Sequence, residues 1–316
     1  MKICFTLKPI ATSYGGGNQF VQNMTKYIKS LNHKVVYNLN DSDVDVIFII
    51  DPRKSPNNRV DLPKVINYKR KHPNVKIIHR VNENDIKRAK PINIEPLLVK
   101  TMKIADIVIF VSEWLRNYFT NKYNLSLNST SILSGCNRDH FYPKSDREFN
   151  FKNRKIKIVT HHWSSNYLKG FYIYEKLCRN NIEFIFVGNW RKESPKPKNI
   201  TLIDPKNGSE LGDILRKCDI YLTATQNEPG GMHYLEGVSC GLPILYRKGG
   251  GGAHEICCKF GLEFDELDDM FDKLDLIMNN YEEYVDGIDY EYLGSERCCK
   301  EYYAVIEKVF LYKNSI

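Results

Sequence analysis

The sequence of 316 residues contains no apolar run of about eighteen residues, which argues against a membrane-spanning helix. Its first residues, MKICFTLKPIATSYGGG, lack the long apolar stretch and the small-residue cleavage site of a signal peptide. The nine cysteines include no CxxC pair, and Cys257–Cys258 and Cys298–Cys299 are adjacent, which suits neither a zinc site nor an ordinary disulfide framework. We therefore expect a cytoplasmic protein with reduced thiols in its core.

Charge is not concentrated in one segment either. The formal charge is +8, but the lysines are spread along the whole chain. Such a balance fits anionic ligands such as sugar nucleotides, or peripheral contact with a membrane surface, and does not single out a nucleic acid. The apolar share of 42% excludes a largely disordered chain, and the length is sufficient for two domains.

Short apolar runs rich in β-branched residues alternate with helical patterns almost throughout. Continuous apolar strands between helices indicate parallel sheets that are covered on both faces. The predicted strands are Lys2–Leu7, Val44–Ile50, Val75–Val81, Asp106–Val111, Ser131–Leu133, Lys155–Thr160, Glu183–Val187, Ile200–Ile203, Asp219–Ala224 and Pro243–Tyr246.

Two helices of the N-terminal half are well marked. Ser112 is the expected N-cap of one of them, SEWLRNYFTNKY. The other follows the first strand and has an apolar stripe of Phe20, Val21, Met24, Tyr27, Ile28 and Leu31.

The alternation of strand and helix patterns stops between Phe141 and Lys155, where the chain is charged and aperiodic. A new predicted strand then begins at Lys155. We place the domain boundary there, giving domains 1–150 and 151–296. The predicted fold class is α/β, with two Rossmann-like, doubly wound domains facing across a cleft. Ligands of such sheets lie beyond the carboxyl ends of the strands, so the motifs that follow strands carry the functional signal.

Three consecutive glycines follow the first strand, in ATSYGGGNQF. Gly16 and Gly17 allow the backbone to approach a ligand at the start of a helix. This is not the GxGxxG fingerprint, and no acidic residue follows at the Rossmann interval. The alternative is a merely flexible turn.

The first strand of the second domain ends in VTHHWSSNYLKGF. Lys169 precedes a predicted helix with Phe171, Tyr174, Leu177 and Cys178 on its apolar side, and its ammonium can reach a diphosphate. His161 and His162 either orient a ligand or are buried structural histidines. Trp163 is either a stacking platform or a core residue.

The segment NEPGGMHYLEGVSCGLPIL, from Asn227 to Leu245, places Glu228 just beyond a strand and Glu236 in the following helix. An ionised carboxylate accepts two hydrogen bonds, which suits the vicinal diol of a ribose or a sugar ring. Gly230–Gly231 opens a helix whose apolar members are Met232, Leu235 and Val238, and its N-terminus can face a phosphate. The alternative for Glu236 is a solvated helix residue.

A second glycine loop, RKGGGGAHEI, follows the next strand and leads into a helix with Glu255. Four glycines are costly in conformational entropy, so we interpret them as permitting close backbone approach. No carboxylate–histidine cluster has the spacing of a metal site, and we expect no metal or other cofactor.

With these motifs the chain resembles the family 4 glycosyltransferases of GT-B architecture, over nearly its whole length. The most specific element is Glu-x7-Glu in EPGGMHYLE, followed by GVSCGLP. The other elements are GGG after the first strand, KG after the first strand of the second domain, SGCNRDHFYP before the linker, and the glycine loop ahead of Glu255.

The resemblance implies retaining transfer of a sugar from a nucleotide-sugar to an acceptor hydroxyl, without a required metal. It assigns Glu236 to the nucleotide ribose, Glu228 and nearby amides to the donor sugar, and Lys169 to the leaving diphosphate. It implies that the acceptor binds the first domain near HRVNEND, where His79 and Arg80 are the candidates for lining the reaction centre. The last helix, within 297–316, would return to the first domain.

One departure affects the phosphate site. The family has an arginine a few residues before the phosphate lysine, whereas this chain reads HHWSSNYLKG, so His162 and Asn166 are the candidates to replace it. Two alternative functions keep the fold, namely a sugar-nucleotide 2-epimerase and a non-catalytic nucleotide-sugar-binding subunit. An NAD oxidoreductase is disfavoured because the fingerprint glycines and the ribose acid are absent.

Overall fold

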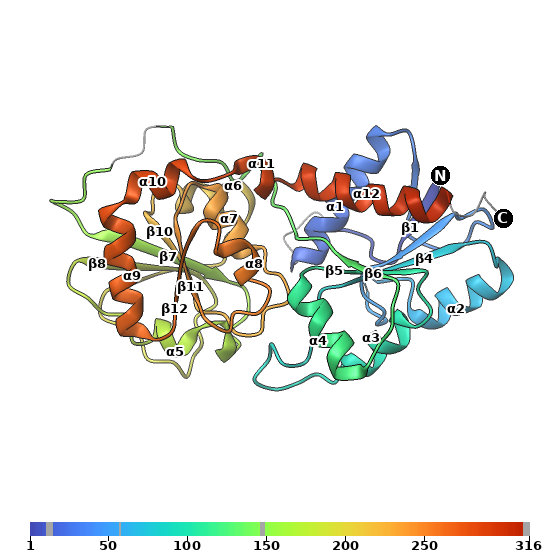
Figure 1. The fold of residues 1–316 in the computed structure, drawn as a ribbon, viewed down its shortest axis with the longest axis horizontal. Coiled ribbons are helices and arrows are strands. Elements are labelled where there is room, and N and C mark those ends of the chain that lie inside the picture. The colour runs from blue at the N-terminus through green and yellow to red at the C-terminus, as the bar shows by residue number, and fades with distance from the viewer. Residues whose placement is uncertain (11–14, 57, 146–148, 312–316) are drawn as a thin grey trace. The chain divides into compact units, whose positions relative to one another are not determined.

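The computed structural model describes residues 1–10, 15–56, 58–145 and 149–311, and it divides into two compact units (Figure 1). The first unit comprises Met1–Asp85, Ile92–Ser134 and the C-terminal segment from Ser295. The second comprises Ile86–Pro91 and Gly135–Gly294.

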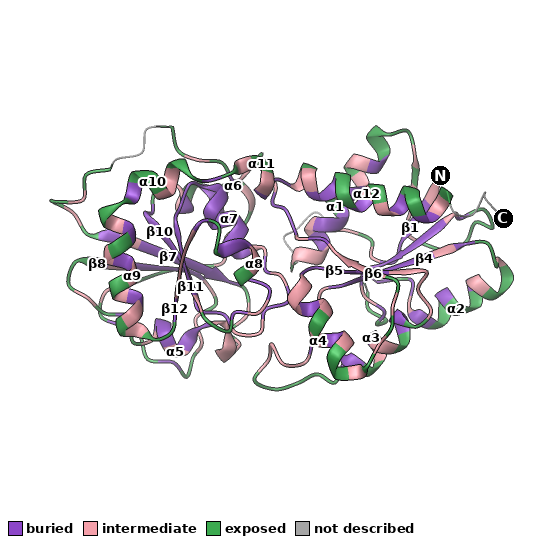
Figure 2. Ribbon diagram, viewed as in Figure 1, coloured by how far each residue is buried: buried purple, intermediate pink, exposed green. Residues whose placement is uncertain are grey.

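The first unit is built on a parallel sheet with the strand order β2-β1-β3-β4-β5-β6. Apolar side chains of alternate strand residues belong to different buried clusters, as expected for a sheet covered on both faces. The ribbon of β4 is coloured as buried along most of its length in Figure 2. Its strands are β1 (Lys2–Phe5), β2 (Lys34–Val36), β3 (Val46–Ile49), β4 (Lys76–Val81), β5 (Ile107–Phe110) and β6 (Ser129–Ser131).

Helices of the first unit begin where the sequence provides caps. The Ser112 hydroxyl accepts a hydrogen bond from the Leu115 amide at 3.1 Å, which confirms the predicted N-cap, and Asp61 caps another helix in the same way. Leu31, assigned to the apolar stripe, lies beyond the end of its helix and is exposed. The helices are α1 (Gly15–Ser30), α2 (Leu62–Lys71), α3 (Glu95–Met102), α4 (Glu113–Tyr123) and α12 (Ser295–Leu311).

The C-terminal helix α12 packs within the first unit, in one apolar cluster with α1 and the central strands. Tyr302 and Ile306 are fully buried there, and the Tyr302 ring lies edge-on to Phe20 with centroids 4.7 Å apart. A C-terminal helix thus completes the core that begins with the N-terminal strand.

The second unit repeats the parallel design with the strand order β12-β11-β10-β7-β8-β9. The described chain therefore confirms two Rossmann-like α/β units. The strands are β7 (Ile156–His162), β8 (Ile182–Gly188), β9 (Ile200–Ile203), β10 (Ile220–Thr223), β11 (Ile244–Arg247) and β12 (Gly261–Phe264).

Two helices of the second unit are shorter than their sequence patterns predicted. The helix after Gly170 is a single turn, so Leu177 is buried beyond its end and Cys178 is exposed. Met232, predicted as an apolar helix member, is the half-buried N-cap. The elements are η1 (Tyr167–Lys169), α5 (Phe171–Tyr174), α6 (Gly208–Leu215), α7 (His233–Ser239), α8 (His254–Cys257), α9 (Leu267–Asn279), α10 (Tyr281–Asp286) and α11 (Tyr290–Leu293).

The chain enters the second unit earlier than the predicted boundary at residue 150. The Cys136 thiol lies 2.9 Å from the Ser239 hydroxyl, and the Cys136 amide donates to the Leu293 carbonyl. The His140 carbonyl accepts from Arg216. The second unit therefore begins at Gly135, before the aperiodic segment where the boundary was predicted.

Two edge strands were not predicted, β2 and β12, and β6 begins two residues before the predicted run. No disulfide joins the cysteines in the described chain; Cys178 and Cys258 are exposed, which corrects the expectation that all nine thiols lie in the core. None of the described helices combines the length and the apolar character needed to cross a bilayer.

The packing of α7 on β10 depends on Gly237, because a Cβ there would lie 2.1 Å from Cδ2 of the fully buried Tyr221. We expect Gly237→Ala to lower the free energy of unfolding by about 1–3 kcal/mol or more, since neither element can move without disturbing the core. Urea unfolding followed by circular dichroism measures it. Gly287→Ala is the control, with its nearest atom at 3.3 Å, and should change stability by less than about 1 kcal/mol. Equal midpoints for the two variants would contradict this packing.

Candidate active site

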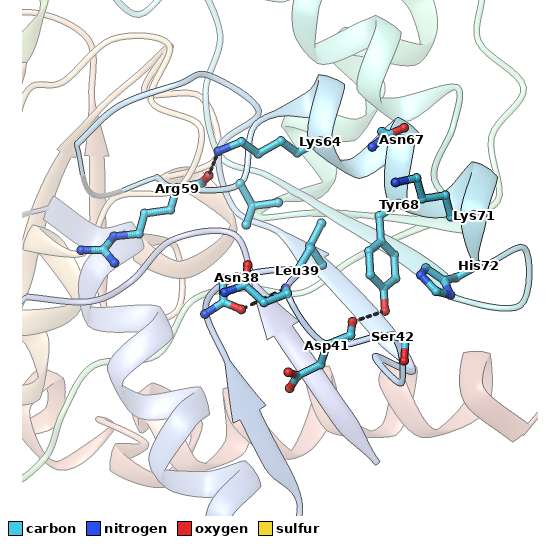
Figure 3. A pocket seen from close by; sticks show the side chains of 12 residues that line it. Asn38, Leu39, Asp41, Ser42, Arg59, Lys64, Asn67, Tyr68, Lys71 and His72 are labelled. Carbon is cyan, nitrogen blue, oxygen red and sulfur yellow. Dashed lines mark hydrogen bonds between the residues drawn. The ribbon is translucent and has the colours of Figure 1, made fainter.

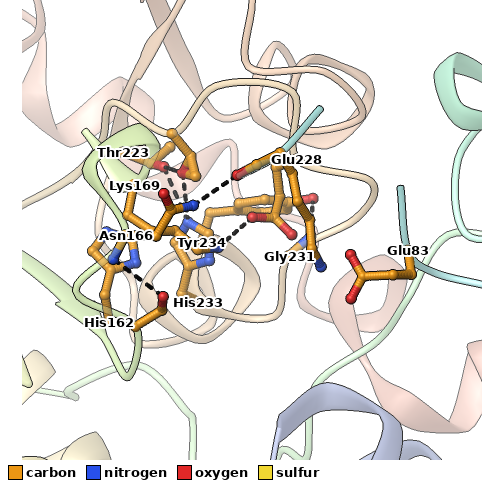
Figure 4. A network of polar contacts seen from close by, with 12 residues as sticks. Glu83, His162, Asn166, Lys169, Thr223, Glu228, Gly231, His233 and Tyr234 are labelled. Carbon is orange, nitrogen blue, oxygen red and sulfur yellow. Dashed lines mark hydrogen bonds and ion pairs between the residues drawn. The ribbon is translucent and has the colours of Figure 1, made fainter. Parts of the chain in front are cut away.

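Lys169 and Glu228 form a partly buried ion pair at the carboxyl-end side of the second sheet (Figure 4). Lys169 ends η1, and Glu228 lies in the loop after β10, where it is 6% exposed. Burial alone would raise the pKa of Glu228, but the positive charges of Lys169 and Lys87 outweigh it and lower that pKa to about 2. The carboxylate is therefore ionised at neutral pH, and the structure brings these two predicted site residues together.

The glycine loop after β11 holds the backbone of Glu228. The Glu228 amide donates to the Gly250 carbonyl at 3.3 Å, and the Glu228 carbonyl accepts from the Gly252 amide at 2.8 Å. Gly251, at φ +70°, has room for no side chain, because a Cβ would lie 2.6 Å from the Glu228 carbonyl oxygen. The close backbone approach expected from this loop is thus an approach to Glu228 itself.

Glu236 lies inside α7 and is 5% exposed, so it is not the solvated helix residue of the alternative interpretation. Its Oε2 is 2.7 Å from Nε2 of His161, and Nδ1 of the same ring is 3.0 Å from the Tyr221 hydroxyl. Burial raises the pKa of Tyr221 well above its ordinary value, so this hydroxyl is protonated and donates to Nδ1. His161 then donates through Nε2 to the Glu236 carboxylate, which fixes the direction of that carboxylate.

Two further histidines lie beneath the ion pair. His162 Nε2 is 3.1 Å from both the Thr160 and Tyr174 hydroxyls, and His233 Nε2 is 3.0 Å from the Thr223 hydroxyl. Burial, assisted by nearby positive charge, lowers the pKa of both rings well below the ordinary value. Both are neutral at physiological pH, so His162 does not supply the charge of the missing arginine.

Asn166 anchors a neighbouring loop. Its Nδ2 donates to the Lys87 carbonyl at 2.7 Å, and its Oδ1 accepts from the Ala89 amide at 3.2 Å. Asn227 adds a bond of 3.3 Å from its Nδ2 to the Ile86 carbonyl. The Asn166 side chain is therefore occupied by backbone groups of residues 86–91, and it too cannot replace an arginine.

Of the predicted donor-binding turn, Gly230 is half-buried and Gly231 is buried. The Gly231 amide donates to the Tyr234 hydroxyl at 2.8 Å, within the same network. The helix α7 has only seven residues, and the Gly231 amide at its start is already bonded. An anion at this site would therefore be bound more strongly by charged side chains than by the amides of the helix N-terminus.

His79 and Arg80, predicted to line the reaction centre, are buried in the core of the first unit. Neither ring nitrogen of His79 has a hydrogen-bond partner in the described chain, and burial lowers its pKa to about 3. Arg80 donates from Nε to the Tyr302 hydroxyl at 3.2 Å and lies over the Phe20 ring. Both are 3% exposed or less, so neither is accessible to a substrate in this structure.

Gly16 and Gly17 lie in the first turn of α1. A Cβ on Gly17 would be 3.6 Å from Ile50, which is ordinary contact, so packing does not require this glycine. Their role in donor binding stays a prediction.

Two hollows were not predicted. One, of about 490 Å³, opens at the ends of β7, β8 and β9, with Ser165, Asn189, Trp190 and Asp204 in its wall. Trp163 lies beside it, with its carbonyl bonded to the Asn189 amide group, and is 55% exposed rather than in the core. The other, of about 360 Å³, belongs to the first unit and is lined by α2 and the β2–β3 connection (Figure 3).

Sequence reasoning also missed His233, Asn227 and Lys87. His233 is three residues before Glu236, a spacing that places both on neighbouring positions of one helix, and this was an available signal. Lys87 had none, because only the folded chain brings it near Glu228. Within the described ranges, no three His, Cys, Asp or Glu side chains come together in a way that would hold a metal ion.

Residues 171–292 match the family described as glycosyl transferases group 1. Among solved structures, the chain resembles a sucrose-phosphate synthase from Thermosynechococcus elongatus, with TM-score 0.70, 13% identity and coverage of 98% of this chain and 99% of that one. A glycosyltransferase from Rickettsia africae gives TM-score 0.68, 15% identity and 98% coverage of each chain. HepE of Anabaena, in complex with UDP and glucose, gives TM-score 0.67, 13% identity and coverage of 98% and 100%. A comparison with curated protein sequences finds no match.

At identities of 13–15% these structures establish the fold, which is GT-B with two Rossmann-like domains, as predicted. The family match covers most of the second unit and includes Glu228 and Glu236, but not Lys169. Assignment to family 4 stays a prediction. Residues 171–292 form a glycosyl transferases group 1 domain, and the chain is a glycosyltransferase of the GT-B fold.

Proposed function

We propose that the protein is a retaining glycosyltransferase that moves a hexose or related sugar from a nucleotide-sugar to an acceptor hydroxyl. The observation that carries this proposal is the partly buried Lys169–Glu228 ion pair in the same open parallel α/β unit as the buried Glu236. Ligands of such sheets bind at the carboxyl ends of the strands, where all three side chains lie. The acceptor would be a glycan, lipid-linked or protein-linked hydroxyl, with peripheral membrane contact in the lipid-linked case.

Lys169 is proposed to bind the donor diphosphate. Its ammonium has three N–H donors, of which Glu228 accepts one. Glu228 thereby holds the lysine in place and is itself held by the glycine loop. A charge-assisted bond to the diphosphate contributes about 1.5–3 kcal/mol. This lysine would supply the positive charge that leaving-group departure needs, and we propose that no resident metal is required.

The two carboxylates are proposed to bind hydroxyl groups. Glu236, oriented by His161, would accept from the ribose diol, and Glu228 from hydroxyls of the donor sugar. The hollow at the ends of β7, β8 and β9 is of a size for the nucleoside, with Trp190 and the exposed Trp163 as aromatic surfaces. HepE, which shares this fold, has been solved with UDP-glucose.

In the proposed transfer, the bond between the anomeric carbon and the diphosphate oxygen breaks, and its electron pair stays on the nucleoside diphosphate. The acceptor oxygen bonds to the same face of the anomeric carbon, which retains its configuration. The acceptor proton leaves with the phosphate oxygen. The negative charge that develops on the diphosphate is stabilised by Lys169 in a water-poor setting, where such a contact is strongest.

The donor is identified by offering UDP-, GDP-, ADP- and dTDP-sugars and recording both the thermal shift and the release of nucleotide. We expect one nucleotide class to raise Tm and to be released slowly. Glu236→Gln keeps an oxygen for His161 but loses the charge, and should weaken nucleotide affinity by about tenfold or more. Glu210→Gln removes an exposed carboxylate of α6 and is the control.

The outcome also separates the alternatives. Conversion of the donor to an epimeric sugar-nucleotide would indicate the 2-epimerase, and tight binding without turnover would indicate a non-catalytic subunit. No response to any of the four nucleotide classes would contradict the proposed function.

Lys169→Ala should lower turnover by about a hundredfold or more, because the departing diphosphate loses its charge partner. Since this variant leaves Glu228 buried without its partner, unfolding must be measured alongside. The double variant Lys169→Met/Glu228→Gln removes both charges and should recover stability without recovering turnover. Lys176→Ala, an exposed lysine of the same segment, is the control. A folded Lys169→Ala protein with full turnover would overturn the role of Lys169.

A further inference from the structure

The short segment Ile86–Pro91 belongs to the second unit, although the chain on both sides of it belongs to the first. Its attachment is specific. Asn166 bonds to the backbone at Lys87 and Ala89, at 2.7 and 3.2 Å, and Asn227 bonds to the Ile86 carbonyl at 3.3 Å. Both asparagines directly flank the site, because Asn166 is three residues before Lys169 and Asn227 immediately precedes Glu228.

This attachment fixes the backbone position of Lys87. Its carbonyl accepts a hydrogen bond from Asn166, and the positive charge of Lys87 acts with that of Lys169 to lower the pKa of Glu228. Lys87 is partly buried, whereas Lys90 of the same segment is exposed. Two lysines from distant parts of the chain therefore act on one buried carboxylate.

We propose that Lys87 is the second cation of the diphosphate site and takes the place of the arginine that the phosphate motif lacks. The inference deepens the proposed function and rests on it. Neither residue suggested by the sequence fills that role, because His162 is a neutral ring bonded to two hydroxyls and the Asn166 amide is occupied by the 86–91 segment.

The chemistry of the ligand explains why a second cation is needed. A nucleoside diphosphate carries charge on both phosphates, and the terminal phosphate gains charge when the sugar leaves. One ammonium whose first partner is Glu228 cannot contact both phosphates equally well. A second ammonium, delivered by an anchored loop, allows each phosphate a charge-assisted contact.

Asn166 is, on this proposal, a positioning residue. It touches no substrate and acts by holding the backbone of Lys87 and Ala89. Removing its amide should release the segment and withdraw Lys87 while leaving the lysine in the sequence. The two residues should therefore act as one unit.

The test is isothermal titration of the wild type and of Lys87→Ala with the nucleoside diphosphate found in the donor panel, and with the corresponding nucleoside. We expect Lys87→Ala to weaken diphosphate binding by about tenfold or more, and nucleoside binding by less than about twofold. Lys87→Arg should restore most of the diphosphate affinity. Lys90→Ala removes an exposed charge from the same segment and should leave both affinities unchanged.

A double-variant cycle separates positioning from a general structural effect. Asn166→Ala should weaken diphosphate binding as Lys87→Ala does, and the double variant should be no weaker than the Lys87 variant alone. Additive losses would overturn the positioning role of Asn166.

Failure of this inference differs from failure of the proposed function. If the wild type binds a nucleoside diphosphate and Lys87→Ala binds it as Lys90→Ala does, Lys87 is not the second cation and the proposed function stands. A loss that affects nucleoside and diphosphate equally, with no rescue by arginine, would also overturn the inference. If the wild type binds no nucleotide at all, both fail together.

Discussion

The partly buried ion pair between Lys169 and Glu228 is the interaction on which the arrangement of the candidate site depends. Removing two charges from water costs several kcal/mol per ion, and mutual attraction only offsets this when the geometry is well held. Here η1 fixes the lysine, and backbone bonds from Gly250 and Gly252 fix the glutamate. Such a pair adds little to stability compared with apolar packing, so its presence is better explained by what the lysine binds.

The neutral histidines follow from that pair. A charged imidazolium beneath Lys169 would repel it, and burial already disfavours the charged ring, so His162 and His233 satisfy their nitrogens with hydroxyl groups instead. His161 differs because its partner is a carboxylate, Glu236. His162 and His233 thus add hydrogen-bonding groups near Lys169 without adding positive charge.

The sequence predicted what local patterns determine. Apolar strands such as β3 and β10 form where they were predicted. Glu228 and Glu236 are both buried in the second unit, and their roles stay predictions. The edge strands β2 and β12 were missed because one has three residues and the other includes Gly261 and Glu263. The partners of the site residues were missed for a different reason: His161 is 75 residues from Glu236, and no local pattern reports such a pairing.

Arg80 and Lys87 show how much the fold decides about a charged residue. Arg80 lies within β4, and Lys87 lies beyond its end. The family resemblance favoured Arg80 as a residue lining the reaction centre. In the structure the Arg80 guanidinium bonds to the Tyr302 hydroxyl and lies over the Phe20 ring. Arg80 therefore links α12 to the first sheet and has a structural role. Lys87 lies seven residues further, in a segment that the second unit holds through its own asparagines. The place of a charged residue along the sequence is therefore a weak guide to its function. What matters is whether the fold holds the backbone of that residue at the site.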